Sequence, residues 1–448
     1  MQLELTLCEL AQVMQAKLIS QTPDEVVTAF VTDSRKVVAG SAFIALKGQQ
    51  YDARCFIPEV LQQGARVIVA QEEGGTFPQT PGVSWLLVKD PLRALQNLAR
   101  FHRLHSSLKV TAITGSNGKS TTKQMLCAIC QTAGETIANT GNFNNQFGVP
   151  FSLLEILPKH RFGVFELGAS HPGDIEETAR LAVPDVAVIT NVSAAHLEFF
   201  HDLETVYRTK TEIARCLREG GTLVYNADDT YLSRLHTEFS GPKISFGFCE
   251  QADVRVQETD LFAFTYRGKR CQTQLRLERH DKLNAAAAAS AALALGLAFS
   301  AIEEGLAHFT PMPMRLERIT KKGVHFLLDC YNANPASMKN ALEILGREKI
   351  TPRVAVVGDM KELGENSPEY HRQVARQILD NNIETAFLAG PNMQPAYEVL
   401  RAVAGMQVYY AAEPAGWMDS LRQTLAQGGS CLVKASRSMH FERVFDEF

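Results

Sequence analysis

The residues with the clearest chemical potential follow a short β-branched run. Val110–Thr114 suits a buried strand, and the sequence Gly-Ser-Asn-Gly-Lys-Ser-Thr follows it directly, at residues 115–121. Met125, Leu126 and Ile129 then repeat at helical spacing. A strand, a glycine-containing turn and a helix N-terminus in this order direct backbone N–H groups toward a phosphate. The stretch therefore predicts a phosphate-binding loop.

Different residues of this loop would have different roles in binding a nucleotide. The glycines allow close approach of the backbone, Lys119 can reach the terminal phosphates of ATP, and the Ser120 hydroxyl can ligate Mg²⁺. The turn is shorter than the common G-x-x-x-x-G-K-[ST] pattern, because position 113 is Ile. An ordinary strand-turn-helix is the alternative, and Lys-Ser-Thr directly after Gly118 argues against it. We predict that ATP is bound by Gly115, Ser116, Asn117, Gly118, Lys119, Ser120 and Thr121.

The composition predicts a globular protein without a nucleic-acid partner. At roughly 150 residues per domain, 448 residues suggest about three domains, and 45% of them are hydrophobic. A net charge of −4 with no basic block gives no electrostatic case for a nucleic-acid partner. The nine scattered cysteines fit reduced thiols. No secretion signal is visible, and the alanine-rich stretch 283–299 suits a tightly packed helix rather than a membrane span. We therefore expect a cytoplasmic protein without membrane insertion.

Changes in pattern along the chain predict three α/β domains. Residues 1–82 mix short strands and helices, and they end in a glycine- and proline-rich segment, residues 72–82. Residues 83–312 contain the phosphate loop in a parallel sheet of the P-loop ATPase type, up to a break with two prolines. Residues 313–448 alternate strands and helices regularly. This last block predicts a Rossmann-like domain, although it lacks G-x-G-x-x-G.

Apolar runs and helical periodicity predict the individual elements. We expect strands at residues 42–46, 66–70, 110–114, 162–166, 185–192, 324–328, 354–357, 385–388, 408–410 and 431–433. We expect helices near residues 57–63, 283–299, 395–403 and 417–425, and helices that begin at Pro335 and Pro368.

Polar side chains follow two of the predicted central strands. Glu166 closes one strand, and His196 lies in the exit loop of another. Because ligands of a parallel sheet bind beyond the carboxyl ends of its strands, both side chains should lie beside the phosphate loop, where they would form a nucleotide-metal site. The ordinary alternatives are a solvated strand end and a capping histidine. Lys210 has only the pattern of a solvated helix residue.

A series of segments in this order resembles the Mur ligase family of peptidoglycan synthesis, over nearly the whole chain. The phosphate loop, Glu166 and His196 resemble the wider superfamily, whereas residues 331–334, 358–360 and 434–437 resemble the members that add a dipeptide. The matching segments are Asp33–Arg35, Thr114–Lys119, Gly141–Asn145, Gly148–Pro150, Glu166–Ala169, Ala194–Glu198, Asp329, Tyr331–Asn334, Val357–Met360, Glu362–Gly364, Val433–Lys434 and Ser436–Arg437.

The resemblance implies ATP-dependent amide formation between UDP-N-acetylmuramoyl-tripeptide and D-alanyl-D-alanine, by a cytoplasmic monomer. Transfer of the γ-phosphate to the substrate carboxylate would give an acyl phosphate, and attack by the amine would expel phosphate. Lys119 and Mg²⁺ would stabilise charge on the transferring phosphoryl group. The first domain would bind the UDP substrate, the second would bind ATP, and the third would complete the ligase site.

The resemblance also assigns roles to residues. Ser120 and Glu166 would hold one Mg²⁺ and His196 a second, while Lys210 aligns with a lysine that the family carbamylates to create a metal-binding anion. Together with Lys119 these form the catalytic set. The third domain's contribution to ATP binding would be Arg315 and Asp329, with Asn284 near the base. The substrate-binding residues would be Ser34, Arg35 and Lys47 at the UDP end, and Asn142, Asn145, Asn332, Asn334, Lys434 and Arg437 elsewhere.

Two kinds of alternative remain at this stage. The first is a sister ligase, or a folylpolyglutamate synthase-like enzyme, that adds a single amino acid. The Asp-Asn-Pro-Arg stretch that resembles the motif for selecting a diamino acid is absent, which argues against a sister ligase that adds a diamino acid. The second is a regulatory nucleotide switch, but the guanine-reading Asn-Lys-x-Asp does not occur.

Overall fold

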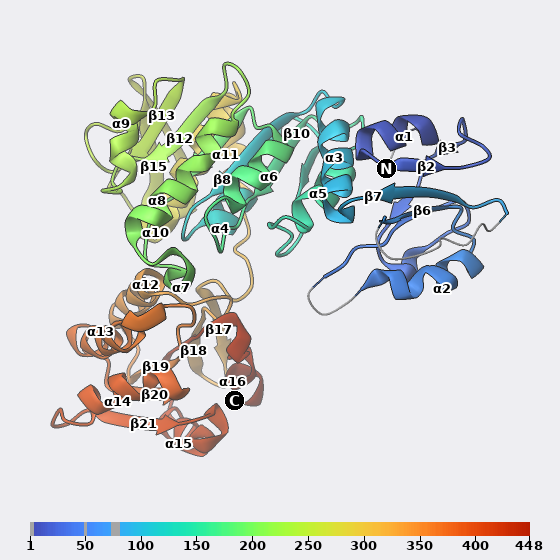
Figure 1. Ribbon diagram of the computed structural model, residues 1–448. Helices are drawn as coiled ribbons and strands as arrows, with labels where there is room; N and C mark the ends of the chain where they lie inside the picture. Colours follow the sequence, from blue (N-terminus) through green and yellow to red (C-terminus); the bar gives the residue numbers. More distant parts are fainter. Residues whose placement is uncertain (1–3, 49–51, 73–80) are drawn as a thin grey trace.

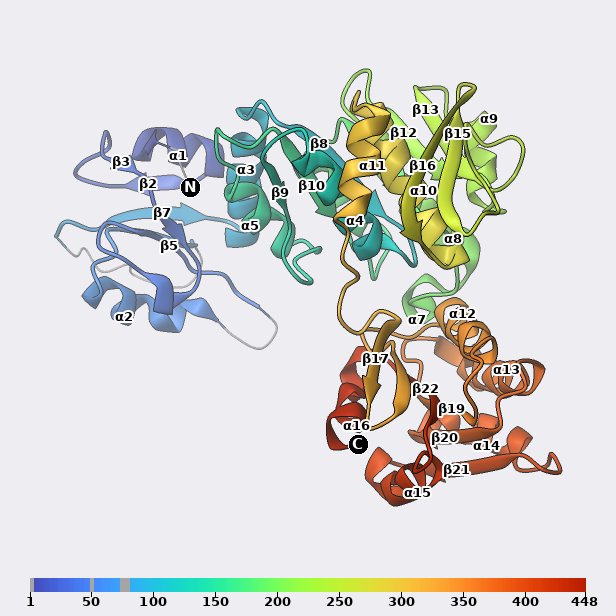
Figure 2. The ribbon, with the colours of Figure 1, turned by 180° about the vertical axis from the view of Figure 1, so that it is seen from behind.

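The computed structural model describes residues 4–48, 52–72 and 81–448, which form three α/β units. The N-terminal unit lies at one flank of the central unit, and the C-terminal unit lies against another side of the central unit (Figures 1 and 2). Both views separate the first and last units, so the central unit joins them. Most of the predicted glycine- and proline-rich segment, residues 73–80, lies outside the described residues.

The N-terminal unit is built on a five-stranded sheet in the order β2-β7-β6-β5-β4. Its strand β7 pairs in parallel with β6, so the sheet extends to Val88 and not to the boundary predicted at residue 82. The glycine- and proline-rich segment thus connects two strands of one sheet instead of two domains. The elements are β1 (Leu5–Thr6), α1 (Leu7–Met14), β2 (Lys17–Ile19), β3 (Val26–Val27), β4 (Phe30–Val31), β5 (Ala42–Ile44), α2 (Ile57–Gln62), β6 (Val67–Gln71) and β7 (Ser84–Val88).

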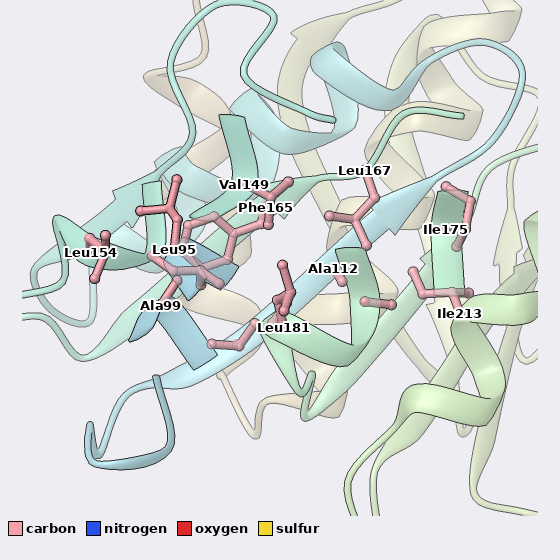
Figure 3. Close-up of a cluster of buried hydrophobic side chains, with 14 of the residues drawn as sticks. Leu95, Ala99, Ala112, Val149, Leu154, Phe165, Leu167, Ile175, Leu181 and Ile213 are labelled. Atoms are coloured by element: carbon pink, nitrogen blue, oxygen red, sulfur yellow. The ribbon is translucent and has the colours of Figure 1, made fainter. Parts of the chain in front are cut away.

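Helix α3 (Pro91–Leu104) joins the N-terminal unit to the central one. Asp90 caps its first turn, and its apolar face contacts α1 on one side and α5 (Gly148–Leu154) and α6 (Asp174–Ala182) on the other. Figure 3 shows Leu95 and Ala99 of this helix among apolar side chains of the central unit, including Phe165. Burial of this shared apolar surface holds the two units together.

The central sheet has nine strands in the order β16-β15-β14-β13-β12-β11-β8-β10-β9. All pairs from β9 to β14 are parallel, and β15 and β16 add an antiparallel hairpin that was not predicted. The strands are β8 (Lys109–Thr114), β9 (Thr136–Ala138), β10 (Phe162–Glu166), β11 (Val186–Ile189), β12 (Thr222–Asn226), β13 (Lys243–Gly247), β14 (Val254–Val256), β15 (Leu261–Tyr266) and β16 (Lys269–Arg276).

Helices cover both faces of the central sheet. One face carries α4 (Lys119–Gln131), α10 (Arg279–Ala294) and α11 (Phe299–Ala307), whereas α3, α5 and α6 pack on the other. The predicted alanine-rich helix is α10, and its alanines allow close packing against α4. It begins at Arg279 and ends at Ala294, so its end was predicted five residues too late. The smaller helices are α7 (Leu197–Phe200), α8 (Leu203–Thr211) and α9 (Leu235–Glu238).

The C-terminal unit is a six-stranded sheet in the order β17-β18-β22-β19-β20-β21, parallel except for β17. Its five predicted strands are confirmed to within two residues, while β17 was missed. The elements are β17 (Glu317–Lys321), β18 (Val324–Leu328), α12 (Pro335–Gly346), β19 (Arg353–Gly358), α13 (Ser367–Asp380), β20 (Thr385–Ala389), α14 (Gln394–Leu400), β21 (Gln407–Ala411), α15 (Met418–Thr424), β22 (Gly429–Lys434) and α16 (Glu442–Glu447). Within the described ranges, no helix combines the length and apolar content that crossing a membrane requires.

Candidate active site

The phosphate loop connects β8 to α4, as predicted, and it needs its two glycines. Gly115 and Gly118 have φ values of +144° and +80°, where residues with a side chain are strained. A β-carbon at residue 115 would lie 1.9 Å from Oγ1 of Thr190, and one at residue 118 would lie 2.1 Å from Oδ1 of Asn284. The glycines therefore let β11 and α10 approach the loop closely.

Lys119 begins α4 and folds back over the loop. Its ammonium donates to the carbonyl oxygens of Gly115 at 2.8 Å and Ser116 at 3.2 Å. Burial, helped by the charge of Arg315, lowers the pKa of Lys119 although Glu166 opposes the shift. The ammonium is thus held where phosphates on the loop would meet it.

Glu166 lies at the carboxyl end of β10, beside the first turn of α4, and is 4% exposed. Its Oε2 accepts from the Ser120 hydroxyl at 2.6 Å, and its Oε1 accepts from the Asn144 amide at 2.9 Å. The Lys123 ammonium is 3.9 Å from Oε2. Burial alone would raise the pKa of Glu166, but Lys119, Lys123 and these hydrogen bonds lower it. The carboxylate therefore stays ionised.

The predicted pairing of Ser120 and Glu166 suits a hard cation. A hydroxyl and a carboxylate oxygen 2.6 Å apart are ligands that Mg²⁺ prefers, and they lie at a helix N-terminus where phosphate oxygens would complete the coordination. Within the described residues, His, Cys, Asp and Glu form no group of three or more that could hold a metal by itself. The donor set thus fits a metal ion shared with a bound nucleotide.

His196 reaches across to the C-terminal unit. Its backbone is left-handed, with φ of 54°, and its Nδ1 makes a short hydrogen bond with Oε2 of Glu362. The backbone N–H of Glu198 donates to the carbonyl of Glu362 at 3.1 Å. With Nδ1 held by the carboxylate, Nε2 is the ring nitrogen available to a metal ion. The structure thus places His196 at the predicted sheet edge.

Lys210 lies on α8 and is only 2% exposed, so the pattern of a solvated residue is misleading. Its ammonium is 5.7 Å from the centre of the Phe200 ring. Burial, followed by the charge of Lys119, lowers the pKa of Lys210 to about 7, against the opposing effect of Glu212 and Asp174. A substantial neutral-amine population therefore exists at neutral pH.

A pocket of about 390 Å³, the Asn284 pocket, lies on one side of the phosphate loop. The loop lines it with Asn117 and Gly118, and α10 lines it with Asn284. Arg315 and Asp329 close it from the C-terminal unit, and their predicted contact with ATP stays a prediction. His280 and Asp281 also line it. Sequence reasoning missed them, although they stand one helical turn before Asn284.

A second pocket of about 710 Å³, the Arg437 pocket, lies on the other side of the loop. The central unit lines it with Ser116, Lys119, Asn142 and His196, and the C-terminal unit lines it with Asn332, Asn334 and Arg437. Four predicted substrate-binding residues, Asn142, Asn332, Asn334 and Arg437, therefore meet at one cavity.

Direct contacts join the two units between these pockets. Arg315 donates to the Ser120 hydroxyl at 2.9 Å and lies 4.0 Å from the centre of the Tyr331 ring. The Asn334 amide donates to Oδ1 of Asn117 at 2.7 Å. The C-terminal unit therefore contacts both the loop and the candidate metal ligand, and completes both pockets.

Two predicted substrate residues have structural partners instead of a free side chain. Lys434 is 1% exposed, and its ammonium donates to Oδ2 of Asp329 at 2.5 Å and to the carbonyl of Asn332 at 2.9 Å. Lys434 therefore positions Asp329 of the Asn284 pocket and Asn332 of the Arg437 pocket. Oδ1 of Asn145 accepts from the N–H of Gly148, the first residue of α5, at 2.9 Å. Direct substrate contact by either residue stays a prediction.

The predicted UDP-binding residues lie in the N-terminal unit, apart from both pockets. Arg35 is exposed and donates to Asp33 at 2.8 Å, and hydrogen bonds from Arg35 lower the pKa of Asp33 to about 2. Ser34 belongs to the same short helical turn, and Lys47 is exposed beside Asp52. Their role stays a prediction.

A phosphate loop on a parallel sheet, closed by a Rossmann-like unit, defines a class of nucleotide-binding α/β enzymes. Family models match residues 27–103 as the Mur ligase family catalytic domain, 113–293 as the Mur ligase middle domain and 314–437 as the Mur ligase glutamate ligase domain. The chain therefore belongs to the Mur ligase family. This membership makes it an ATP-dependent, ADP-forming ligase.

Individual relatives match over the full length. The UDP-N-acetylmuramoyl-tripeptide–D-alanyl-D-alanine ligase of Haemophilus influenzae is 35% identical, over 99% of this chain and 98% of its own. A crystal structure of MurF from Acinetobacter baumannii has a TM-score of 0.91 and 31% identity, covering 100% and 99% of the two chains. MurF from Thermotoga maritima in complex with ADP has a TM-score of 0.83 and 30% identity, covering 94% and 96%.

Proposed function

We propose that this chain joins D-alanyl-D-alanine to UDP-N-acetylmuramoyl-tripeptide, with conversion of ATP to ADP and phosphate, in peptidoglycan precursor synthesis. The observation that carries the proposal is the position of the phosphate loop between two pockets of different size. A ligase needs such an arrangement, because the phosphoryl group must pass from a nucleotide to a second substrate. Full-length relatives that are named UDP-N-acetylmuramoyl-tripeptide–D-alanyl-D-alanine ligase support the choice of substrates.

The Asn284 pocket would hold the nucleoside of ATP, with Asn284 near the base and with Arg315 and Asp329 closing the site. The triphosphate would lie along residues 115–121, whose backbone N–H groups and helix N-terminus favour anions. Lys119 would then leave the carbonyls of Gly115 and Ser116 and bind the terminal phosphates. Its charge would stabilise the phosphoryl group during transfer to the substrate carboxylate.

Ser120 and Glu166 would hold one Mg²⁺, and His196 would contribute to a second ion. Bound Mg²⁺ would supply positive charge that screens the phosphates from the incoming carboxylate. Lys210 would join this second site as a carbamate, formed when its neutral amine adds carbon dioxide and releases a proton. Its lowered pKa, about 7, supplies the neutral amine that this reaction needs.

The Arg437 pocket would hold the acceptor dipeptide and the reacting end of the tripeptide. The Arg437 guanidinium would bind a carboxylate, and Asn142, Asn332 and Asn334 would supply amide hydrogen bonds. Lys434 would orient Asn332 and Asp329, and Asn145 would hold the loop that carries Asn142 and Asn144. Ser34, Arg35 and Lys47 would contact the UDP end from the N-terminal unit.

We also propose a division of labour among three functional domains, in a cytoplasmic monomer. The first would bind the UDP substrate and extend to Val88, the second would bind ATP up to residue 312, and the third would complete the ligase site. The nine cysteines are free, which suits a reducing compartment. Both pockets are formed within one chain, so no second copy is needed.

The test is ADP release by the purified protein with ATP, Mg²⁺ and UDP-N-acetylmuramoyl-tripeptide, with different acceptors compared at equal concentration. We expect turnover with D-alanyl-D-alanine, at least 100-fold above that with D-alanine, L-glutamate or meso-diaminopimelate, and a product mass equal to the nucleotide pentapeptide. Turnover with a single amino acid and none with the dipeptide would establish the sister ligase or folylpolyglutamate synthase-like alternative instead.

A further inference from the structure

We infer that Glu362 forms the binding site for the ammonium group of the amine acceptor, an inference that rests on the proposed ligase function. Glu362 lines the Arg437 pocket from the loop that follows β19. Its side chain is 47% exposed, so the carboxylate is accessible from this cavity. Glu362 lies in a segment that resembles the Mur ligases, but the resemblance assigns it no role; the role follows from the charges around the pocket.

The charges around the Arg437 pocket are mostly positive. Lys119, Lys361 and Arg437 line the same pocket with basic side chains, whereas Glu362 is the only carboxylate among its described lining residues. These cations suit phosphates and carboxylates, but they repel an incoming ammonium group. An acceptor that enters as an ammonium ion therefore needs a local negative charge, and Glu362 is the group that supplies it.

The two oxygens of the Glu362 carboxylate differ in their hydrogen bonding. Its Oε2 is occupied by Nδ1 of His196, and no described residue donates to its Oε1. The hydrogen bond to His196 fixes the orientation of the Glu362 carboxylate at the wall of the cavity. One oxygen is thus fixed and the other is free for an ammonium N–H, an arrangement that gives a charge-assisted hydrogen bond.

Glu362 lines the same pocket as Lys119 of the phosphate loop. His196 lies at the same edge of the central sheet as the phosphate loop, and Lys119 lines the pocket beside it. An amine bound at Oε1 of Glu362 would therefore lie between the loop and the C-terminal unit. There it would face the carbon of an acyl phosphate formed next to Lys119.

The backbone of this segment is anchored independently of the Glu362 side chain. The Glu362 carbonyl accepts from the N–H of Glu198, and a β-carbon at Gly364 would lie 3.4 Å from Cα of Glu198. The Lys361 N–H donates to the Ser436 hydroxyl at 2.9 Å. The substitution Glu362→Gln keeps the side-chain shape and these backbone contacts, so it removes the charge without removing the loop.

The experiment compares wild type, Glu362→Gln and the control Glu365→Gln, which removes an exposed carboxylate three residues along the same loop. Three measurements are made on each: KM for D-alanyl-D-alanine, KM for ATP, and the inhibition constant of propionyl-D-alanine. The inhibitor is the same dipeptide without its amino group. Hydroxamate formation with hydroxylamine, a nucleophile that is uncharged at neutral pH, reports acyl-phosphate formation separately.

We expect Glu362→Gln to raise KM for the dipeptide by roughly 10- to 100-fold, the range for losing a hydrogen bond between charged groups. KM for ATP and inhibition by propionyl-D-alanine should change less than threefold, and Glu365→Gln should match wild type in every measurement. An equal loss of affinity for propionyl-D-alanine, or a loss of hydroxamate as large as the loss of ligation, would mean that Glu362 acts only through His196 or the fold, and would overturn the inference.

The failure of the proposed function gives a different result. A wild-type protein that forms neither amide nor hydroxamate from the nucleotide tripeptide would refute the ligase function and the ammonium site together. A wild-type protein that forms both products, with an unchanged dipeptide KM in Glu362→Gln, would refute the ammonium site alone.

Discussion

The Asn284 pocket and the Arg437 pocket share the phosphate loop as a wall, but they differ in size and charge. The smaller one, about 390 Å³, has Asp229, Asp281 and Asp329 against Arg315 and His280. The larger one, about 710 Å³, has the cations of Lys119, Lys361 and Arg437. Carboxylates repel a polyphosphate but accept hydrogen bonds from an uncharged nucleoside, so the difference would orient ATP across the loop, with its terminal phosphate toward the larger pocket.

The largest expected effect follows from a substitution in the phosphate loop, which lines both pockets. Lys119→Ala removes the ammonium that would face the transferring phosphoryl group, which should cost on the order of 3 kcal/mol or more in transition-state stabilisation. We expect the rate of ADP release to fall by about 100-fold or more. Thermal unfolding should stay near that of wild type, because the side chain is only partly buried and its partners are loop carbonyls. Near-normal turnover would contradict the assignment of the loop.

The second effect concerns Lys210, whose amine lies in the central unit close enough to Lys119 to feel its charge. We expect Lys210→Ala to be nearly inactive, with partial rescue by added formate or acetate that replaces the carbamate. Depletion of bicarbonate should slow wild type reversibly. Turnover is measured in carbon dioxide-free buffer with and without each addition, and full activity of the alanine variant would rule out the carbamate.

A third prediction separates the two pockets. Asn284→Ala should raise KM for ATP by about tenfold and leave KM for the dipeptide unchanged, because one hydrogen bond is worth about 1–1.5 kcal/mol. Arg437→Gln should show the reverse pattern. Initial-rate kinetics with each substrate varied in turn gives all four constants. If both variants changed both constants alike, the pockets would not hold separate substrates.

The smallest effect is on the pH dependence of stability. The pKa of Lys210 is about 7 in the folded protein and about 10.4 in an unfolded chain, so the unfolded state binds more protons between these values. Stability should therefore rise with pH in this window, by about 1 kcal/mol from pH 7.5 to 8.5. Lys210→Met should lose this rise. Denaturant unfolding at the two pH values, in carbon dioxide-free buffer, measures the difference; an equal slope in both proteins would place the lysine in a solvated environment.

Much of the fold could be predicted because strands of a parallel sheet are buried on both faces and appear as continuous apolar runs. Of the strands that were missed, β15, β16 and β17 lie at or next to sheet edges, where the apolar signal is weak. The strands β7, β12 and β13 were missed inside their sheets, because their short apolar runs are bounded by polar residues or glycine. The domain boundary near residue 82 was misplaced because glycines and prolines mark a connection equally well within a sheet and between domains. The pairing of β6 with β7 decides between these, and it is not a local property.

Some residues of the candidate site could likewise be predicted from the sequence, and others could not. The phosphate loop, Glu166 and His196 were predictable, because a parallel sheet brings the ends of its strands together. Asn144, Lys123 and Glu362 were not, because their partners come from separate elements. The burial of Lys210 was also hidden, since α8 has no strongly apolar face that would mark this position as interior.

The central claim is that the phosphoryl group passes across the loop from one pocket to a carboxylate in the other. It is tested most directly with nucleotide tripeptide whose reacting carboxylate carries ¹⁸O on both oxygens. Attack by the amine on an acyl phosphate leaves one labelled oxygen in the amide and expels the other with phosphate. Mass analysis or ³¹P NMR of the released phosphate should therefore find one ¹⁸O for each amide formed. Unlabelled phosphate, with amide formed in equal amount, would contradict the account.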